Sequence, residues 1–158
     1  MQEVIKILTE KNKTIATMES CTGGGVVNAI TNIEGASDVL KFSAVTYSNE
    51  YKIKLGVSSD TIDKYSVYSV EVAREMALNI SKFADANYGI GITGKLNRVD
   101  KNNPYGSDNT TFVSIYDKDN DEYLEFKIEA TKSTRALNKE LIINKIIDKM
   151  LEVINDWY

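Results

Sequence analysis

Apolar residues recur every three or four positions in four segments of the chain, which is the spacing that places side chains on one face of an α-helix. The predicted helices cover residues 2–12, 22–33 and 69–83, and a C-terminal segment from about residue 133. The apolar positions that define their buried faces are Val4, Ile5, Leu8, Val26, Val27, Ile30, Ile33, Ala73, Met76, Ala77, Ile80, Phe83, Leu137, Leu141, Ile147, Met150, Leu151 and Ile154. Each of these helices can therefore pack one side against a sheet.

Short apolar or alternating runs lie between the helices. They predict strands at residues 13–18, 39–48 and 87–94, and a hairpin at 110–130 around the turn 118–121. Helices and strands alternate through the first two thirds of the chain, the hairpin follows, and a helix closes it. This order predicts an α/β fold, a three-layer α/β/α sandwich on a mixed β-sheet, with residues 1–158 forming a single domain.

The composition limits the cellular compartment in which we expect this domain and the classes of partner that it could bind. The 158 residues are 42% hydrophobic and 27% charged, and no apolar stretch is long enough to span a bilayer. The start of the chain is amphipathic rather than a secretion signal, and one cysteine cannot form an internal disulfide, so we expect a cytoplasmic protein without a membrane partner. A net charge of −4 argues against nucleic acid as the partner.

The sequence contains no histidine. This excludes Ser-His-Asp triads, Cys-His pairs and imidazole metal sites, and with them most familiar hydrolytic arrangements. A nucleophile in this chain therefore needs another base. The candidates are a lysine in a desolvated site, a carboxyl group with a raised pKa, and a tyrosine acting together with one of them.

The stretch ESCTGGG at residues 19–25 joins a predicted strand to a predicted helix. Glycines at such a place let a substrate approach the backbone closely, and free N–H groups at a helix start can hold an oxyanion or a phosphate. A nucleophilic Ser20 would be well placed there. The alternative is that Ser20 or Thr22 only caps the helix and that the glycines allow tight packing.

The stretch VTYSNEYK at residues 45–52 offers a possible base. Asn49 is the expected N-cap of a short helix that stops at Gly56, which would place Lys52 in the first turn. The positive end of the helix dipole would then disfavour the ammonium form of Lys52. The alternative is that Lys52 is a solvated lysine and Tyr47 a half-buried strand residue.

Three stretches together resemble the CinA C-terminal domain family, also called the nicotinamide-nucleotide amidase family. They are ESCTGG, VTYSNEYKIKLGV and the strand end GITG, and the resemblance runs essentially from end to end of the chain. The larger members of that family carry an additional domain, so this chain would be the stand-alone form. The resemblance implies amide hydrolysis of nicotinamide mononucleotide to nicotinic acid mononucleotide and ammonia, and it implies a homodimer.

The family's residues map onto this chain by motif. The nucleophilic serine falls on Ser20, the lysine on Lys52, the tyrosine on Tyr47 and the threonine that ends the central strand on Thr93. In the mechanism that follows, neutral Lys52 takes the proton of Ser20, and Tyr47 relays or orients it. Backbone N–H groups of the oxyanion turn, which comprises Cys21, Thr22, Gly23 and Gly24, stabilise the oxyanion. No metal or organic cofactor is needed.

The chain departs from the family after the central strand. Residues 95–109 replace the usual glycine- and proline-rich turn, and Arg135 and Lys139 compete for the position of an arginine near the start of the last helix. We expect the substrate to contact Thr93, Gly94, Lys95, Arg98 and Arg135. Lys95 and Arg98 could hold a phosphate, or they could simply be solvated loop charges.

Two alternatives follow from these departures. Cys21 is either a small residue packed at the helix start or, because thiolates are strong nucleophiles, a reactive group in place of Ser20. The domain as a whole is either an amidase, for a pyridine nucleotide or another small amide, or a module of the same fold that binds nucleotides without turnover.

Overall fold

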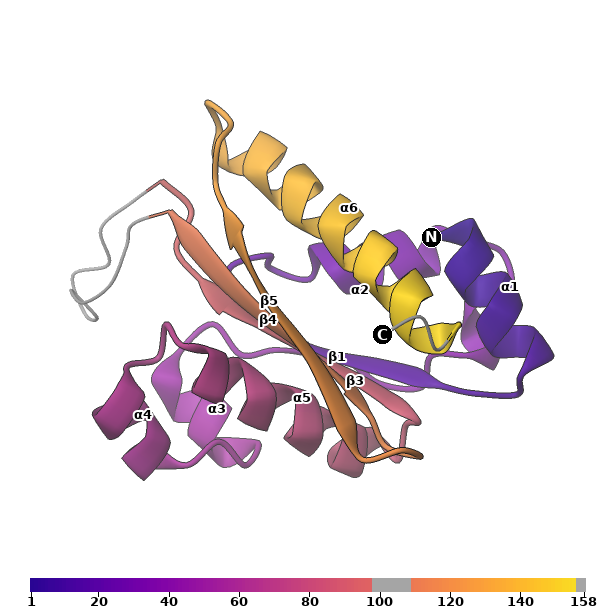
Figure 1. Cartoon of the computed structure of the whole chain (residues 1–158), viewed down its shortest axis with the longest axis horizontal. Coiled ribbons are helices and arrows are strands. Elements are labelled where there is room, and N and C mark those ends of the chain that lie inside the picture. The colour runs from indigo at the N-terminus through magenta and orange to yellow at the C-terminus, as the bar shows by residue number, and fades with distance from the viewer. Residues whose placement is uncertain (98–108, 156–158) are drawn as a thin grey trace.

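The computed structural model describes residues 1–97 and 109–155, and these form one five-stranded mixed sheet covered by helices on both faces (Figure 1). The described elements are, in chain order, α1 (Gln2–Glu10), β1 (Ile15–Glu19), α2 (Gly25–Thr31), η1 (Ala36–Asp38), β2 (Ala44–Val45), α3 (Asn49–Lys54), α4 (Ser59–Tyr65), α5 (Val70–Ala84), β3 (Tyr88–Gly94), β4 (Thr110–Asp117), β5 (Glu122–Glu129) and α6 (Arg135–Ile154). The three-layer α/β/α sandwich that the sequence predicts is confirmed.

The strands lie in the order β2-β1-β3-β4-β5. β1 pairs in parallel with both β2 and β3, whereas β4 pairs antiparallel with both β3 and β5. The carboxyl ends of β1, β2 and β3 consequently meet at one edge of the sheet. Because parallel strands in α/β folds present ligand sites at that edge, the segments that follow β1, β2 and β3 are where chemistry is expected.

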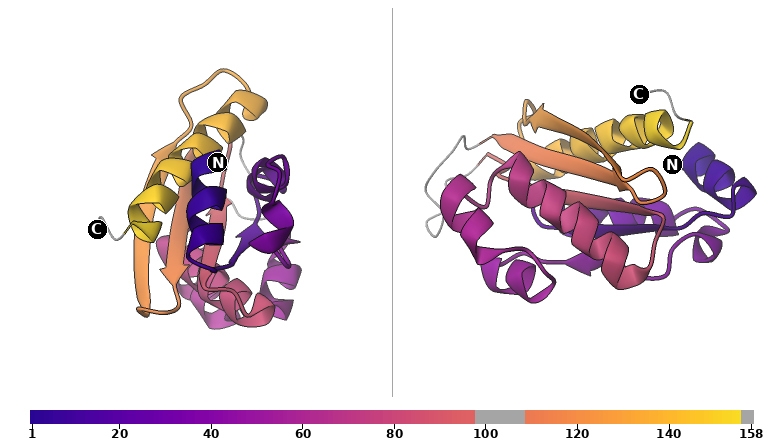
Figure 2. Two further views of the ribbon diagram at one scale, coloured as in Figure 1. Left: turned by 90° about the vertical axis from the view of Figure 1, so that its right-hand side faces the viewer. Right: turned by 60° about the horizontal axis from the view of Figure 1, so that its bottom comes forward.

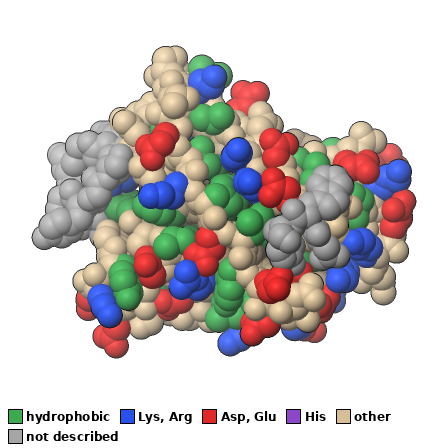
Figure 3. Space-filling view, in the orientation of Figure 1, with side chains coloured by type: hydrophobic (Ala, Val, Ile, Leu, Met, Phe, Trp, Pro, Cys, Tyr) green, Lys and Arg blue, Asp and Glu red, His purple; other side chains and the backbone are tan. Residues whose placement is uncertain are grey.

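Helices α1, α2 and α6 cover one face of the sheet, and α5 covers the other together with α3 and α4 (Figures 1 and 2). Each face has its own core. One core joins β1, β3 and β4 to α1, α2 and α6, and the other joins β1 to α5 and the segments around α4. On the face of the molecule seen in Figure 3, basic and acidic side chains are intermingled. None of the helices within the described ranges is long and apolar enough to cross a membrane.

Two glycines of β3 allow α5 to lie directly on the sheet. A Cβ atom at Gly89 would stand 2.1 Å from the carbonyl oxygen of Ala77, and one at Gly91 would stand 2.1 Å from that of Ala73. Neither carbonyl can move without breaking the helix. The glycine-rich composition of the predicted central strand therefore has a packing cause.

We expect Gly91→Ala to destabilise the fold by about 3 kcal/mol, the upper part of the range for overpacking, because the obstructing atoms are backbone. Gly35→Ala is the control, since no atom lies within 4 Å of its added Cβ and only its φ of +90° opposes the change. That strain costs about 1–2 kcal/mol. Urea unfolding of both variants measures the difference, and equal losses would mean that α5 can shift away from β3.

Several helices and strands differ from the sequence prediction. The strand expected at 39–48 is reduced to Ala44–Val45 and a single bridge between Leu40 and Ile15, because most of the other residues of that segment are irregular chain that follows 3-10 helix η1. Helix α2 begins at Gly25 rather than at residue 22, since residues 21–24 form a turn. Helix α4 was not predicted. It buries none of its side chains fully, so it leaves no apolar stripe to recognise.

The buried face of α6 is also displaced from the predicted one. Its fully buried positions are Asn138, Ile142, Ile146, Met150, Val153 and Ile154, whereas Leu137 is 45% exposed. Leu141, Ile147 and Leu151 flank the buried stripe and pack only partly against the core. On α5, Phe83 is 62% exposed and its ring contacts that of Phe42, with centroids 5.0 Å apart. Both helices carry more apolar residues than the sheet can cover.

Candidate active site

Ser20 lies directly after β1, on the turn that leads into α2. It is 8% exposed. The turn is closed by two backbone hydrogen bonds, one from the Gly23 N–H to the Ser20 carbonyl (2.9 Å) and one from the Gly25 N–H to the Thr22 carbonyl (3.0 Å). Gly23 and Gly24 have φ values of +61° and +93°, a region that favours glycine. The glycines of the motif thus serve the turn that presents Ser20.

Lys52 reaches Ser20 from α3. Its Nζ donates to Ser20 Oγ over 3.0 Å and to the carbonyl oxygen of Thr46 over 2.6 Å. Thr46 is held in turn by a hydrogen bond from its N–H to the carbonyl of Glu19 (2.8 Å). Lys52 is 1% exposed, so this is a buried amine in contact with a buried hydroxyl. The two residues that the motifs single out, 32 positions apart, meet at the carboxyl edge of the sheet.

The helix-dipole argument for Lys52 is wrong. The N-cap of α3 is Ser48, whose Oγ accepts from the Tyr51 N–H, and Asn49 is already the first helical residue. Lys52 therefore lies in the last turn of this six-residue helix, where the dipole favours a cation. Lys52 is instead 1% exposed, and removal from water in general disfavours the charged form of an amine.

The start of α2 is already occupied. Glu19 is fully buried, and its Oε1 accepts from Thr22 Oγ1 (2.7 Å) and from the Val26 N–H (2.9 Å). Its Oε2 accepts from the Val27 N–H (2.9 Å) and from Thr17 Oγ1 (3.1 Å). The expectation that N–H groups at this helix start could hold an oxyanion or a phosphate is therefore wrong for the first turn of α2.

The oxyanion turn offers other donors. The N–H of Gly23 is engaged with Ser20, whereas the N–H groups of Cys21, Thr22 and Gly24 make no hydrogen bond to another residue in the described part of the chain. These amides neighbour the Ser20 hydroxyl along the chain. They are the groups that an oxyanion formed at Ser20 could use.

Cys21 is buried beside this turn. It is 4% exposed, and its Sγ lies 3.8 Å from Thr111 Oγ1. Burial raises the pKa of the Cys21 thiol to about 11, although the Thr111 hydroxyl and the positive charges of Lys52 and Arg135 act in the opposite direction. At neutral pH the thiol is protonated and enclosed. This geometry supports a packing role for Cys21 rather than a nucleophilic one.

We expect the folded protein to react slowly with thiol reagents. With a pKa of about 11, about one thiol in a thousand is ionised at pH 8, and burial limits access further. Labelling of Cys21 by iodoacetamide should be at least about 100-fold slower in buffer than in denaturant. Cys21→Ser should retain most of the amide hydrolysis proposed below, and rapid labelling with loss of that activity would restore Cys21 as the nucleophile.

The other predicted residues are brought to the same edge to different degrees. Thr93 is buried, and its hydroxyl donates to the Val67 carbonyl (2.9 Å). Gly94 packs against Thr111, where a Cβ would stand 2.5 Å from the Thr111 Cα. Tyr47 is 66% exposed, and the structure does not bring it into the Ser20–Lys52 pair. Its role as a proton relay stays a prediction.

The basic residues of the site come from the segment that follows β3 and from α6. Lys95 is only 3% exposed, and its Nζ lies 4.8 Å from the ring centre of Tyr68, so it is not a solvated loop charge. Arg135 donates from Nη1 to the Leu96 carbonyl (2.7 Å). Lys139 Nζ lies 3.5 Å from the position of a Cβ on Gly23. Arg98 lies outside the described residues.

Two residues of the site, Glu19 and Thr46, were not predicted from the sequence. Glu19 was given no role, although a charged side chain is conspicuous at its place in ESCTGG, between a buried strand and the nucleophile. Thr46 acts through its carbonyl group, which leaves no signal in the sequence.

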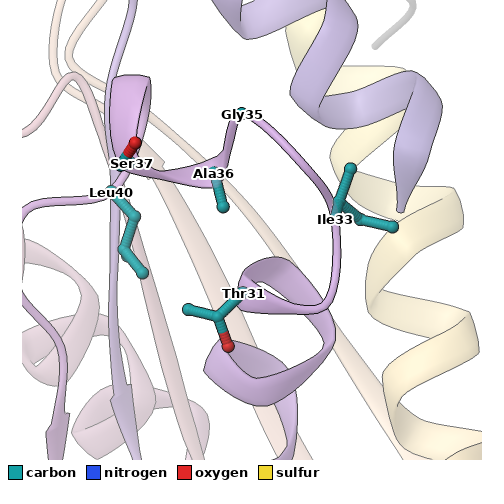
Figure 4. A pocket seen from close by; sticks show the side chains of 6 residues that line it. All are labelled: Thr31, Ile33, Gly35, Ala36, Ser37 and Leu40. Atoms are coloured by element: carbon teal, nitrogen blue, oxygen red, sulfur yellow. The ribbon is translucent and has the colours of Figure 1, made fainter.

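The described residues hold no metal cluster, and a hollow lies away from Ser20. Among residues 1–97 and 109–155, no three His, Cys, Asp or Glu side chains lie together as possible metal ligands. A hollow of about 430 Å³ lies between the end of α2 and η1 (Figure 4), lined by Thr31, Ile33, Gly35, Ala36, Ser37 and Leu40. No ionisable side chain lines it, so we assign it no chemistry.

Comparison with known proteins identifies relatives over the whole domain. The family model described as CinA C-terminal domain matches residues 1–154. A CinA-like protein of Flavobacterium psychrophilum is 36% identical over 152 residues, which are 94% of this chain and 34% of that protein. A putative competence-damage inducible protein of Alkaliphilus oremlandii is 50% identical over 96 residues, 60% of this chain and 23% of that one. The chain thus spans about a third or less of the length of these relatives.

Solved structures share the fold. The competence/damage inducible protein CihA of Agrobacterium tumefaciens superposes with a TM-score of 0.83 at 25% identity, covering 97% of this chain and 92% of that one. A CinA superfamily protein of Klebsiella pneumoniae superposes with a TM-score of 0.86 at 20% identity, covering 99% and 96%. At these identities the likeness concerns the arrangement of helices and strands.

Proposed function

The chain belongs to the CinA C-terminal domain family, and from this membership together with the contact between Lys52 and Ser20 we propose that it is an amidohydrolase. Its proposed reaction is the deamidation of nicotinamide mononucleotide to nicotinic acid mononucleotide and ammonia. The observation that carries the proposal is the 3.0 Å separation of Lys52 Nζ and Ser20 Oγ, both of them buried. In a chain without histidine, this pair supplies a nucleophile and a base in direct contact.

The first half of the reaction forms an acyl-enzyme. The neutral amine of Lys52 accepts the proton of Ser20 while Oγ attacks the carboxamide carbon, and the carbonyl oxygen becomes an oxyanion. The Thr46 carbonyl accepts a hydrogen bond from Lys52 Nζ and so holds the amine beside Ser20 Oγ, where the lone pair of the neutral form can take the Ser20 proton. Collapse of the intermediate breaks the C–N bond, and Lys52 returns the proton to the leaving nitrogen, which departs as ammonia.

The second half releases the acid. A water molecule gives a proton to Lys52 and attacks the ester carbon, and Ser20 leaves as its alcohol after recovering that proton. The pyridine carboxylate is the product. In both halves the N–H groups of Cys21, Thr22 and Gly24 are the proposed donors to the oxyanion, and removing one such donor costs about 10²–10³-fold in known hydrolases. No step requires a metal or an organic cofactor.

The proposed substrate is a nucleotide because Arg135 and Lys139 place positive charge close to the oxyanion turn, and Lys95 follows a strand that ends at the same edge of the sheet. The charge of Arg135 acts on the Cys21 thiol, Lys139 Nζ lies close to Gly23, and Lys95 is buried after β3. A dianionic phosphate is the ligand that such a group of cations favours. The homodimer implied by the family stays a prediction.

We expect Arg135→Gln to raise KM for nicotinamide mononucleotide by about 10–100-fold, the range for losing a charged hydrogen bond. KM for nicotinamide riboside, which lacks the phosphate, should change by less than about threefold. Lys127→Gln, on the exposed edge of β5, is the matched charge control and should alter neither constant. Steady-state kinetics with both substrates measure the two KM values. Equal increases in KM for the nucleotide and the riboside would show that Arg135 does not contact the phosphate.

The direct test of the proposed function is ammonia release from nicotinamide mononucleotide, measured with and without a chelator. Turnover that survives the chelator is the expected result. Binding of the nucleotide without turnover would instead identify a nucleotide-binding module, and turnover that depends on a divalent ion would exclude the Ser20–Lys52 mechanism.

A further inference from the structure

The side chain of Glu19 connects the strand before the nucleophile to the helix after it. Its two oxygens accept four hydrogen bonds, two from hydroxyls and two from backbone N–H groups, at 2.7–3.1 Å. The backbone donors lie seven and eight residues further on, at the first turn of α2. The oxyanion turn lies between these two anchor points, so the carboxylate fixes both of its ends.

A fully buried carboxylate is stable only when its acceptor positions are filled. Here the donors are Thr17 on β1, Thr22 in the turn, and Val26 and Val27 in α2. Thr17 Oγ1 also lies 2.9 Å from Ser43 Oγ, which extends the network to the segment before β2. A neutral side chain of the same shape could not accept all four bonds, because an amide nitrogen would face the N–H of Val27.

The backbone of Glu19 also reaches the base. Its carbonyl accepts from the Thr46 N–H, and the Thr46 carbonyl accepts from Lys52 Nζ. Ser20 is the next residue in the chain. Both members of the Ser20–Lys52 pair are therefore placed with reference to a single residue.

We propose that Glu19 is a positioning residue for the nucleophile: its buried carboxylate clamps the oxyanion turn so that Ser20 Oγ and the turn amides keep the geometry needed at the transition state. This inference rests on the proposed function. Because the carboxylate takes the first free N–H groups of α2, the oxyanion is left to the amides of the turn. A loosened turn misplaces nucleophile and donors together, and a displacement of about 1 Å can cost about 10²-fold in rate.

Glu19→Gln tests the clamp. We expect kcat for nicotinamide mononucleotide to fall by about 10²-fold with KM within about twofold, since Glu19 does not touch the substrate. Labelling of Ser20 by a fluorophosphonate, followed by mass spectrometry, should slow by a similar factor. This second measurement needs no substrate, so the positioning of Ser20 is tested even if the wild-type protein releases no ammonia, a result that would overturn the proposed function alone.

The hydrogen bond from Thr22 provides an independent variant. Thr22→Val removes the hydroxyl that donates to Glu19 but keeps the backbone N–H, and kcat should fall by about 10-fold, whereas Thr22→Ser should lose less. The double variant with Glu19→Gln should be no slower than Glu19→Gln by more than about twofold, because both changes act on one clamp. Fully multiplicative losses would overturn the inference.

Asn87→Ala is the control for stability. Asn87 Oδ1 accepts from the Thr14 N–H at the other end of β1, about 20 Å from Ser20 by strand length. Its loss should lower Tm and leave kcat unchanged. Glu19→Gln with a lowered Tm but wild-type kcat and wild-type labelling of Ser20 would reduce Glu19 to a structural residue.

Discussion

Ser20→Ala is expected to reduce kcat for amide hydrolysis by about 10⁴–10⁶-fold, to the background of the assay, because the covalent route is then closed. Nucleotide binding should be retained, since the cations around the oxyanion turn are untouched. The hydroxyl accepts a single hydrogen bond from Lys52 in this structure, and its removal leaves the turn closed by its own backbone bonds. Ammonia release and a direct binding titration on the same preparation measure both properties.

Ser81→Ala is the matched control for the loss of a buried serine hydroxyl. Ser81 is fully buried in α5, and its Oγ donates to the Ala86 carbonyl over 2.7 Å, far along the chain from the turn. We expect it to lower stability by about 1 kcal/mol, the usual net contribution of such a bond, and to leave kcat unchanged.

Full activity in Ser20→Ala would mean that a water molecule or another residue attacks the amide.

Much of the fold can be predicted because the spacing of apolar residues along the sequence distinguishes helices from strands. Val4, Ile5 and Leu8 in α1 are buried as predicted, and the hairpin of β4 and β5 turns at residues 118–121. The prediction of helices and strands failed where the local pattern of apolar residues does not determine the structure. Strand β2 pairs for only two residues, and the roll of α6 depends on which of its two apolar stripes meets the sheet.

The sequence motifs pointed to the two side chains that the fold brings into contact, but not to the surroundings of that contact. The motifs indicate Ser20 and Lys52, but the expected N-cap was one residue late, so the expected effect of the helix dipole on Lys52 was wrong. The burial of Lys52 arises only in the folded chain. Glu19 illustrates the same limit, because the sequence shows a charged residue at that position but not that its carboxylate fills the start of the following helix.

Lys52→Arg is expected to be nearly as inactive as Lys52→Ala, with kcat/KM reduced by about 10³-fold or more. Arginine keeps the positive charge but cannot lose its proton in a protein, so it cannot act as the base for Ser20. The measurement is kcat/KM for nicotinamide mononucleotide across pH 6–10. The wild-type protein should show activity that rises with pH, since only the neutral amine accepts the proton, and the variants should lack this acid limb.

The interpretation depends on Lys52 being buried, because a guanidinium must fit where an amine contacted Ser20 and Thr46. Lys52→Met, which keeps most of the length of lysine without its charge, separates lost chemistry from disturbed packing. If Lys52→Met folds with a Tm near that of the wild type and is inactive, the amine itself is needed. If Lys52→Arg retains most of the activity while Lys52→Met does not, Lys52 acts by its charge. The base would then have to be Tyr47, which would need to leave its exposed position, or a carboxylate.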